Sequence, residues 1–286
     1  MKFNFIKLNR SEFFVEKMCH LLEVSTSGFY EWLDRPDSNR ETENQAIIKK
    51  IKGIHEGPKR VYGSPRITQE LQDEGFEVSE NRIARLMKKA GISAKTSKKF
   101  KVVTTDSNHS YPVSPNLLNR CFVAEKLNQV WLSDITYIRL GNKFGYLCAI
   151  MDLFNREIIG WSFAMNMHTD LVIDALRKAI RKANPASGLI FHSDRGSQYA
   201  SKEFREHLEI MGFKSSMSRK GDCWDNAPME SFFHTLKTEE VYCKDYKQFN
   251  VAKNNLFDYI EVFYNRIRKH SSLGYLSPLQ YLEKCA

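Results

Sequence analysis

Short apolar runs between residues 129 and 165 have the length and composition of strands. Three runs, 129–140, 144–154 and 157–165, are rich in β-branched and aromatic residues, and only the turns "GNK" and "NR" separate them. Runs of this kind joined by tight turns predict an antiparallel meander.

After the meander, helical and extended patterns alternate. The pattern predicts, in order, a helix at 169–183 ended by Asn184–Pro185, a strand at 188–194, a helix at 201–212, a short strand at 214–219 and a helix at 226–241. Strand–helix–strand connections add parallel strands, so the sheet should be mixed. The order βββαβαβα is that of the ribonuclease-H-like fold, and we predict an α/β core of that class.

The N-terminal third has helical periodicity instead. Residues 11–34 read as two short helices with Ser25 or Thr26 as the cap of the second. Residues 38–57 predict an amphipathic helix whose apolar side carries four isoleucines: Ile47, Ile48, Ile51 and Ile54. This region should therefore be all-α.

A second helix pair follows at 64–92. Pro65 should open its first helix and Gly75 should end it, and Ser79 should cap the second. The apolar stripe of the second helix is Ile83, Leu86 and Met87. Two short helices joined by a tight turn that contains glycine are typical of a helix-turn-helix unit.

Residues 102–125 show no clear period and carry Pro, Ser, Thr and Asn, which predicts a linker or an extended arm. The expected division of the chain is a helical DNA-binding region at 1–105 with helix-turn-helix-like units near 11–34 and 64–92, a linker at 106–125, a ribonuclease-H-like core at 126–240 and a C-terminal helical extension of the core at 241–286. In that extension an apolar set is expected to pack on the core: Leu256, Ile260, Phe263 and Tyr264.

The composition of the chain indicates what kind of partner it binds. The formal net charge is +9, with 42% hydrophobic and 27% charged residues, which is ordinary for a globular protein but favours a polyanion such as nucleic acid. Four cations lie on the second helix of the 64–92 pair: Arg82, Arg85, Lys88 and Lys89. They predict contact with double-stranded DNA, the alternative being a solvated helix face.

Other classes are disfavoured. No apolar run reaches the length that spans a bilayer, and the N-terminus lacks the apolar core of a signal peptide. The six cysteines are scattered without metal-site spacing, which argues against a disulfide scaffold or structural zinc. The expected location is the cytoplasm, at the nucleoid, with no membrane partner.

Three acids are candidates for chemistry. Asp134 lies in the middle of the first predicted strand, Asp194 at the carboxyl end of the fourth, and Glu230 on the last core helix. The first and fourth strands can be neighbours in this order, and ligands of open α/β sheets bind at the carboxyl ends of strands. Carboxylates brought together repel unless a hard divalent cation neutralises them. The trio therefore suggests Mg²⁺, with two ions able to promote phosphodiester displacement.

With those acids in place, a set of motifs identifies a family. The chain closely resembles OrfB-type transposases of the bacterial insertion sequence 3 family, whose catalytic core is shared with retroviral integrases. The matching segments are "VWLSDITYI", "DLFNREIIGW", "FHSDRGSQY", "GDCWDNAPMESFFHTLKTE" and "YNRIRKHSSLGYLSP", with "YGSPRI" and "RIARLMKKAGI" upstream. They cover roughly residues 25–282, and as an ordered set they are highly specific.

The resemblance implies a DDE site made of Asp134, Asp194 and Glu230, which catalyses cleavage and strand transfer with two Mg²⁺ ions, for which Mn²⁺ substitutes. Asp194 and Glu230 are separated by 35 residues, the spacing typical of this class. Lys237 matches the family's basic residue that is expected to touch DNA. The implied partners are element ends and target DNA, further copies of the chain in a synaptic complex, and an upstream helix-turn-helix protein or frameshift fusion.

Several neighbouring residues keep two interpretations. Arg195 and Gln198 fit either DNA-backbone contact or turn structure, and His192 fits a general base or a packed, hydrogen-bonded imidazole. Asp152, another strand-end acid, is expected to be structural. Asp222 and Asp225 are expected in a loop or cap, with Asn226 capping the Glu230 helix. The segment Arg266–His270 either covers the core or contacts DNA.

Two competing functions remain at this point. One is a nuclease or resolvase on the same scaffold, which would cleave without joining. The other is a DNA-binding regulator that retains an inactive core, against which the three intact acids argue.

Overall fold

The computed structural model describes residues 1–36, 38–57, 60–94, 111–220 and 223–285 of the 286-residue chain. The chain forms two compact units, Met1–Lys52 and Gly53–Ala286. The domain boundary that composition suggests near residue 105 lies outside the described residues, so the predicted domain limits stay predictions. Asp222 also lies outside the described residues.

The first unit contains three short helices and most of a fourth. They are α1 (Lys2–Asn9), α2 (Val15–Leu21), α3 (Thr26–Asp34) and α4 (Asn39–Glu56). Ser25 caps α3, since its Oγ accepts a hydrogen bond from the Gly28 N–H at 3.2 Å. A small core of Ile6, Met18, Cys19 and Phe29 holds α1–α3 together.

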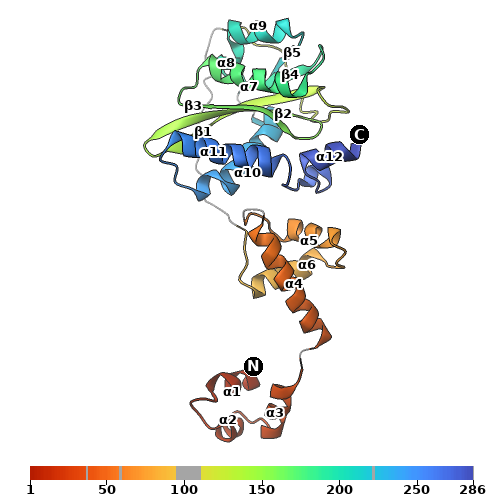
Figure 1. Cartoon of the computed structure of the whole chain (residues 1–286), viewed down its shortest axis with the longest axis vertical. Helices are drawn as coiled ribbons and strands as arrows, with labels where there is room; N and C mark the ends of the chain where they lie inside the picture. Colours follow the sequence, from red (N-terminus) through yellow and green to blue (C-terminus); the bar gives the residue numbers. More distant parts are fainter. Residues whose placement is uncertain (37, 58–59, 95–110, 221–222, 286) are drawn as a thin grey trace. The chain divides into compact units, whose positions relative to one another are not determined.

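The second unit begins with a helix pair, α5 (Ser64–Asp73) and α6 (Glu80–Lys89), drawn in orange in Figure 1. Gly75 has φ of +87°, a left-handed conformation that favours glycine and ends α5. Ser79 Oγ accepts from the Arg82 N–H at 3.3 Å and caps α6. The helix pair, its turn and its cap are confirmed.

A five-stranded mixed sheet forms the centre of the second unit. Its strands are β1 (Val130–Leu140), β2 (Lys143–Asp152), β3 (Ile158–Ala164), β4 (Ile190–Ser193) and β5 (Lys214–Met217), in the order β3-β2-β1-β4-β5. The first three are antiparallel, whereas β4 pairs in parallel with both β1 and β5. The predicted meander with parallel additions, and so the ribonuclease-H-like order, is confirmed.

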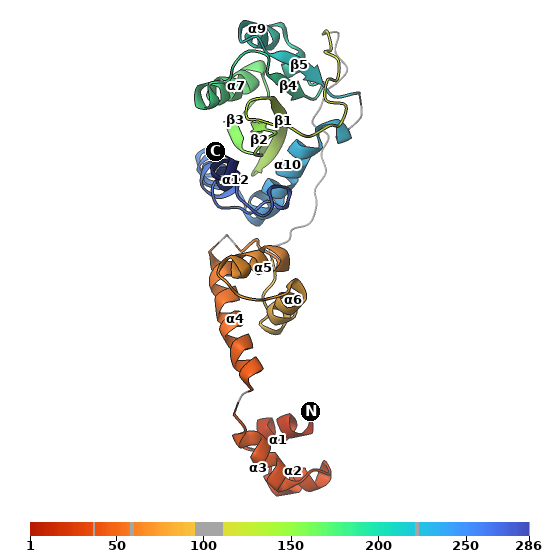
Figure 2. The same ribbon diagram turned by 90° about the vertical axis from the view of Figure 1, so that its right-hand side faces the viewer.

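Helices cover both faces of this sheet (Figures 1 and 2). One face carries α7 (Thr169–Ala183), α8 (Ser197–Ala200) and α9 (Lys202–Ile210), and the other carries α10 (Ala227–Glu239), α11 (Phe249–Phe257) and α12 (Pro278–Cys285). Gly160 of β3 lets α7 approach closely, because a Cβ there would lie 2.5 Å from the Ala175 carbonyl oxygen. The main core fills the layer between the sheet and α7–α9.

The described part of the expected linker packs against the edge strand β5. Ser114 Oγ lies 2.9 Å from Ser215 Oγ, and the Leu117 N–H donates to Ser216 Oγ at 2.9 Å. This segment covers the outer side of an edge strand, where unpaired backbone groups would otherwise be open.

The C-terminal extension packs on the core as predicted. Leu256 of α11 and Ile260, Phe263 and Tyr264 of the following π-helical turn η3 (Asp258–Tyr264) are buried. Short 3₁₀ turns, η1 (Cys223–Asn226), η2 (Val241–Cys243) and η4 (Ser271–Leu273), complete the unit.

The segment Arg266–His270 joins the C-terminal extension to α5. The Lys269 N–H donates to the Tyr62 hydroxyl at 2.9 Å, and Arg66 Nε donates to the Lys269 carbonyl at 3.0 Å. Lys269 Nζ lies 2.6 Å from Asp73 Oδ2. Because Arg268, Lys269 and His270 are buried, the structure favours the covering role over DNA contact for these three residues.

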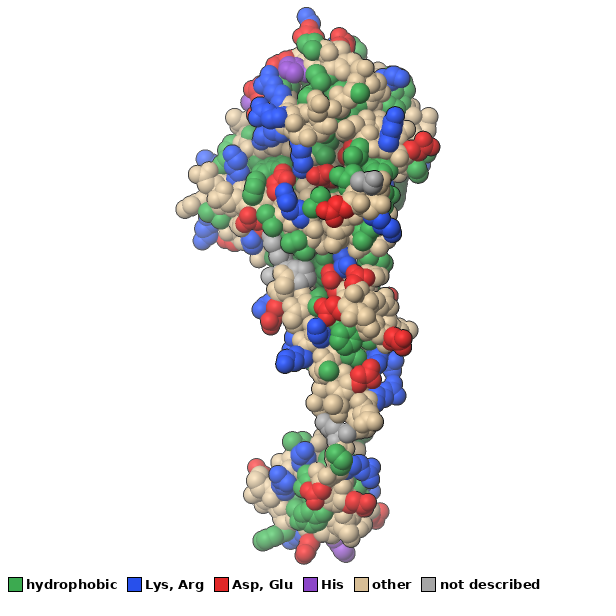
Figure 3. All heavy atoms as spheres, turned by 45° about the vertical axis from the view of Figure 1, so that its right-hand side comes forward, with side chains coloured by type: hydrophobic (Ala, Val, Ile, Leu, Met, Phe, Trp, Pro, Cys, Tyr) green, Lys and Arg blue, Asp and Glu red, His purple; other side chains and the backbone are tan. Residues whose placement is uncertain are grey.

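Charge is mixed over the face shown in Figure 3, where acidic side chains lie among basic ones. Of the helices in the described ranges, none is both long and apolar enough to cross a membrane.

Candidate active site

The fold brings the strands of the two candidate aspartates side by side. Asp134 lies within β1, and Asp194 directly follows the last residue of β4, its parallel neighbour. Glu230 lies in the first turn of α10, on an exposed position, while Asp134 and Asp194 are partly exposed. The three acids thus come from three different elements. The sequence predicts the order of these elements along the chain, and the structure shows how they are arranged in space.

Asp134 lies within electrostatic range of the other two carboxylates. Burial raises the pKa of Asp134 well above its ordinary value, and the negative charge of Asp194 raises it further, with a smaller contribution from Glu230. A hydrogen bond from the Ile135 N–H and the charge of Lys237 act in the opposite direction. A cation at this point would relieve the repulsion.

The donor set is made of oxygen atoms only, which suits a hard divalent cation. In the part of the chain that the structure describes, no three His, Cys, Asp or Glu side chains are gathered as a ready-made metal cluster. The residues fit such an ion by chemistry and electrostatics.

Asn226 ties the start of α10 to β1. Its Nδ2 donates to the Ser133 carbonyl at 3.0 Å, beside Asp134, and it makes no side-chain cap. Asn226 stands at the predicted N-cap position of α10, but its side chain forms no cap hydrogen bond, because the bond from Nδ2 to the sheet orients the side chain away from the helix N–H groups. Its Oδ1 is buried without a hydrogen-bond partner.

Behind Asp134 lies a buried polar contact that the sequence did not reveal. Ser133 Oγ lies 2.8 Å from the Tyr199 hydroxyl and also donates to the Ala149 carbonyl at 3.1 Å. Tyr199 belongs to α8, five residues after Asp194. The contact therefore links the strand of one acid to the helix that follows the other.

His192 is a packed, hydrogen-bonded histidine. Its Nδ1 lies 2.8 Å from Ser216 Oγ and its Nε2 lies 2.9 Å from the Asp225 carbonyl. Burial lowers its pKa to about 4, so the imidazole is neutral at pH 7. These contacts favour the structural interpretation over a general base.

Asp225 anchors the segment just before α10 through several hydrogen bonds. Its buried carboxylate accepts two hydrogen bonds from the Arg219 side chain, at 2.7 and 2.8 Å, and others from Arg120 and Asn116. The Arg219 hydrogen bonds hold its pKa well below the usual range.

Asp152 is structural, as expected. Its carboxylate accepts from the backbone N–H groups of Asn128 and Phe154 at 2.8 and 2.9 Å. The carboxylate thereby joins the segment before β1 to the turn between β2 and β3.

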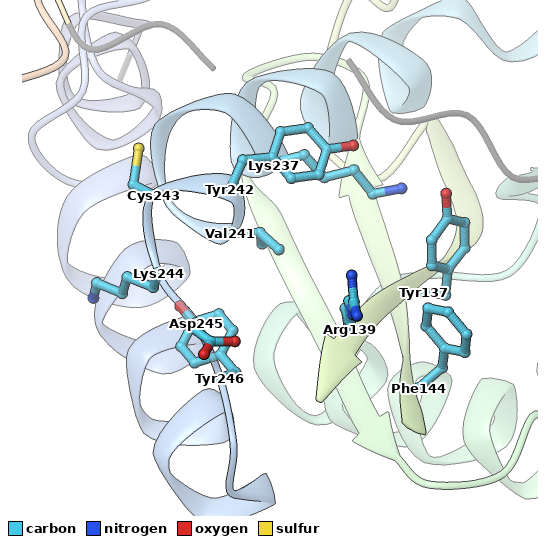
Figure 4. A pocket seen from close by; sticks show the side chains of 10 residues that line it. All are labelled: Tyr137, Arg139, Phe144, Lys237, Val241, Tyr242, Cys243, Lys244, Asp245 and Tyr246. Atoms are coloured by element: carbon cyan, nitrogen blue, oxygen red, sulfur yellow. The ribbon is translucent and has the colours of Figure 1, made fainter. Parts of the chain in front are cut away.

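Lys237 lies beside the ring of Tyr137 (Figure 4). Its Nζ is 4.2 Å from the centre of the Tyr137 ring. Burial lowers its pKa, and the charge of Asp134 opposes that shift. The structure thus brings a partly buried cation within electrostatic range of Asp134.

The other predicted DNA contacts have different surroundings. Arg195 Nε donates to the Ser218 carbonyl at 2.6 Å, and Gln198 Nε2 donates to the Met167 carbonyl at 3.0 Å, so both contribute to the local structure. On α6, Arg85, Lys88 and Lys89 are exposed and Arg82 is partly exposed.

The fold and site define a class that comparison with protein families supports. Two models described as "Integrase core domain" match residues 124–223 and 230–285, and one described as "HTH-like domain" matches residues 42–100. The chain is a protein with an integrase core and a helix-turn-helix-like region.

Full-length relatives identify the family. The chain is 38% identical to "Transposase InsF for insertion sequence IS3A" of Escherichia coli (strain K12), over 99% of both chains. It is 42% identical to an insertion element IS600 protein of 31 kDa from Shigella sonnei, over 93% of this chain and 98% of that protein. This chain belongs to the IS3-family transposases.

A solved structure of a simian T-cell lymphotropic virus intasome contains a similar chain, with a TM-score of 0.48 and 15% identity. The match covers 82% of this chain and 73% of that chain.

Proposed function

We propose that this transposase binds the ends of its insertion element and joins them to target DNA at a site formed by Asp134, Asp194 and Glu230. The observation that carries the proposal is geometric: Asp134 lies on β1, Asp194 follows the paired strand β4, and Glu230 lies in the first turn of α10, which packs against β1. Burial raises the pKa of Asp134, and the charges of Asp194 and Glu230 raise it further, which supports the proposal. Its DNA substrate implies that it acts at the nucleoid, in the cytoplasm.

Asp134, Asp194 and Glu230 would hold Mg²⁺, two ions in the full complement, with Mn²⁺ able to substitute. When bound, the metal activates the attacking oxygen and stabilises the leaving oxygen. Repelling carboxylates on a strand, a strand end and a helix favour such a hard cation.

The chain's own residues have separable tasks in this reaction. Asn226 and the Ser133–Tyr199 contact hold β1, α8 and α10 in register around the acids. Lys237 places a positive charge beside Asp134, where a DNA phosphate can bind. In the joining step a 3′-hydroxyl forms one P–O bond while one P–O bond of the target breaks, with inversion at phosphorus. No side chain of the enzyme forms a covalent bond to DNA in this step.

The test is strand transfer of a pre-cut element end into a plasmid by the full chain with Mg²⁺. We expect a joined product, because the proposed site activates a DNA hydroxyl as well as water. Cleavage of the plasmid with no joined product would favour the nuclease instead. Running the assay with and without the upstream helix-turn-helix protein shows whether this chain acts alone.

DNA contact by α6 is a second part of the proposal, and Arg195 and Gln198 are proposed to approach the backbone near the acids. Arg85 and Lys88 lie one turn apart on an exposed face of α6. Replacing both with Ala should weaken binding to an end duplex about tenfold in moderate salt. The plot of log affinity against log salt should also become less steep, by nearly one for each DNA phosphate that the variant no longer neutralises.

Fluorescence anisotropy at several salt concentrations measures both quantities. The matched control is Arg177→Ala with Lys202→Ala, two exposed cations on α7 and α9. An unchanged slope in the α6 variant would assign its cations to a solvated face.

A further inference from the structure

A pocket of about 630 Å³ opens beside the candidate active site. It lies between the β1–β2 hairpin and the chain that follows α10 (Figure 4). Its lining is Tyr137, Arg139, Phe144, Lys237, Val241, Tyr242, Cys243, Lys244, Asp245 and Tyr246. Aromatic and basic side chains thus line the same pocket.

The lining has three parts. They are the aromatic pair Tyr137 and Phe144, the ring of Tyr242, and the two cations Arg139 and Lys237. Tyr137 and Phe144 meet edge to face, with centroids 5.4 Å apart and planes at 90°. In Figure 4, Arg139 and Lys237 extend into the space between this pair and Tyr242, whereas Cys243 and Lys244 point away from it. Phe144 is 39% exposed, a large apolar ring left open to a ligand.

This combination is the chemistry that recognises a single-stranded nucleotide. Bases stack on aromatic side chains, and cations beside the rings hold the phosphates. The volume lies within the usual range of pockets for ligands of this size. A small molecule without negative charge would leave Arg139 and Lys237 unused.

The pocket and the acids share Lys237, whose Nζ contacts Tyr137 and whose pKa responds to Asp134. Tyr137 is three residues from Asp134 along β1, so the two Cα atoms are about 10 Å apart and the side chains leave opposite faces of the strand. Lys237 is therefore the link between the pocket and the acids, and a nucleotide held beside it would lie near the reacting phosphate.

We propose that this pocket receives an unpaired nucleotide of the element end, stacked on Phe144 or Tyr242, with Arg139 on its phosphate. The inference rests on the proposed function. A base still stacked in a duplex cannot reach such a pocket, so occupation requires the terminal pairs to open, which costs free energy. Stacking in the pocket offsets that cost and holds the strand end beside the acids.

The experiment compares two element-end duplexes, one fully paired and one with its last three nucleotides unpaired. Binding to the full chain is measured without divalent cation, so that cleavage does not contribute. The wild-type chain should prefer the unpaired end about tenfold, within the range for stacking of one base. Phe144→Ala with Tyr242→Ala should lose this preference and bind the paired end unchanged.

Phe257→Ala is the matched control, since Phe257 is a 51% exposed aromatic residue on α11 that lines a different hollow. It should keep the preference. As a direct readout, 5-iododeoxyuridine at each unpaired position should crosslink to a peptide that contains Phe144 or Tyr242.

Two failures are distinguishable. Equal binding of both ends by the wild-type chain, or crosslinks confined to other peptides, would overturn the pocket assignment even while strand transfer proceeds. A chain that prefers the unpaired end but never joins it would support the pocket and contradict the proposed reaction.

Discussion

Replacing Asp194 with Asn should reduce strand joining about a thousandfold or more in saturating Mg²⁺. The substitution keeps the size of the side chain but removes the charge that the proposed metal site needs. Loss of several kcal/mol of transition-state stabilisation corresponds to this factor. The measurement is the initial rate of joining of a pre-cut end, with binding of the same DNA followed separately.

Asp174→Asn is the control, because Asp174 is an exposed acid on α7 whose loss should leave joining within a few-fold of wild type. DNA binding by Asp194→Asn should stay near the wild-type level, since removal of a negative charge does not weaken attraction to phosphate. Joining by Asp194→Asn within tenfold of the wild-type rate would show that Asp194 holds no essential cation.

The core was predictable because its strands have clear local patterns. The run around Asp134 is apolar and β-branched, and its turns are short, so β1, β2 and β3 follow from pattern alone. The helix α1 was not predicted because it lacks an apolar stripe and buries only Ile6. The helix α8 was not predicted because its four residues are too few to show a helical periodicity.

The candidate site was predictable only in part. Motif order picks out Asp134, Asp194 and Glu230, but periodicity cannot say that Ser133 meets Tyr199 or that Asn226 reaches the sheet. These contacts join residues 66 and 93 positions apart. Asn226 has good cap chemistry and stands at the cap position, yet the bond from its Nδ2 to a long-range carbonyl fixes the side chain so that its Oδ1 accepts no helix N–H. The aromatic pocket has no sequence signal for the same reason, since only the fold brings Phe144 and Tyr242 to one pocket.

Long-range pairing also explains the segment Arg266–His270, whose charges suggested DNA contact as readily as structure. Arg268 meets Glu239, at the end of α10, through two hydrogen bonds of 2.8 and 2.9 Å. Both side chains are more than nine-tenths buried, and the Tyr259 hydroxyl donates to the same carboxylate at 2.7 Å. Burial alone would lower the pKa of Arg268, but Glu239 outweighs it and the pKa is raised. Arg268 therefore stays ionised in the core, where Glu239 accepts its hydrogen bonds.

Arg268→Ala should lower the free energy of unfolding by about 3–5 kcal/mol, because it leaves the carboxylate of Glu239 buried without its main counter-charge. Arg66 lies 3.7 Å from Glu239 and offsets part of the loss, so the lower end of the range is expected. Arg266→Ala is the matched control, since Arg266 is exposed two residues away and should shift stability by less than about 0.5 kcal/mol. Urea unfolding of both variants, followed by tryptophan fluorescence, measures the difference.

A second variant separates lost charge balance from lost packing. Arg268→Met with Glu239→Leu removes both charges while keeping apolar volume, and it should recover a large part of the stability that Arg268→Ala loses. If Arg268→Ala matched Arg266→Ala, the pair would contribute nothing to folding and the segment would be free for DNA contact. If the double variant were as unstable as Arg268→Ala, the uncompensated charge of Glu239 would not account for the loss.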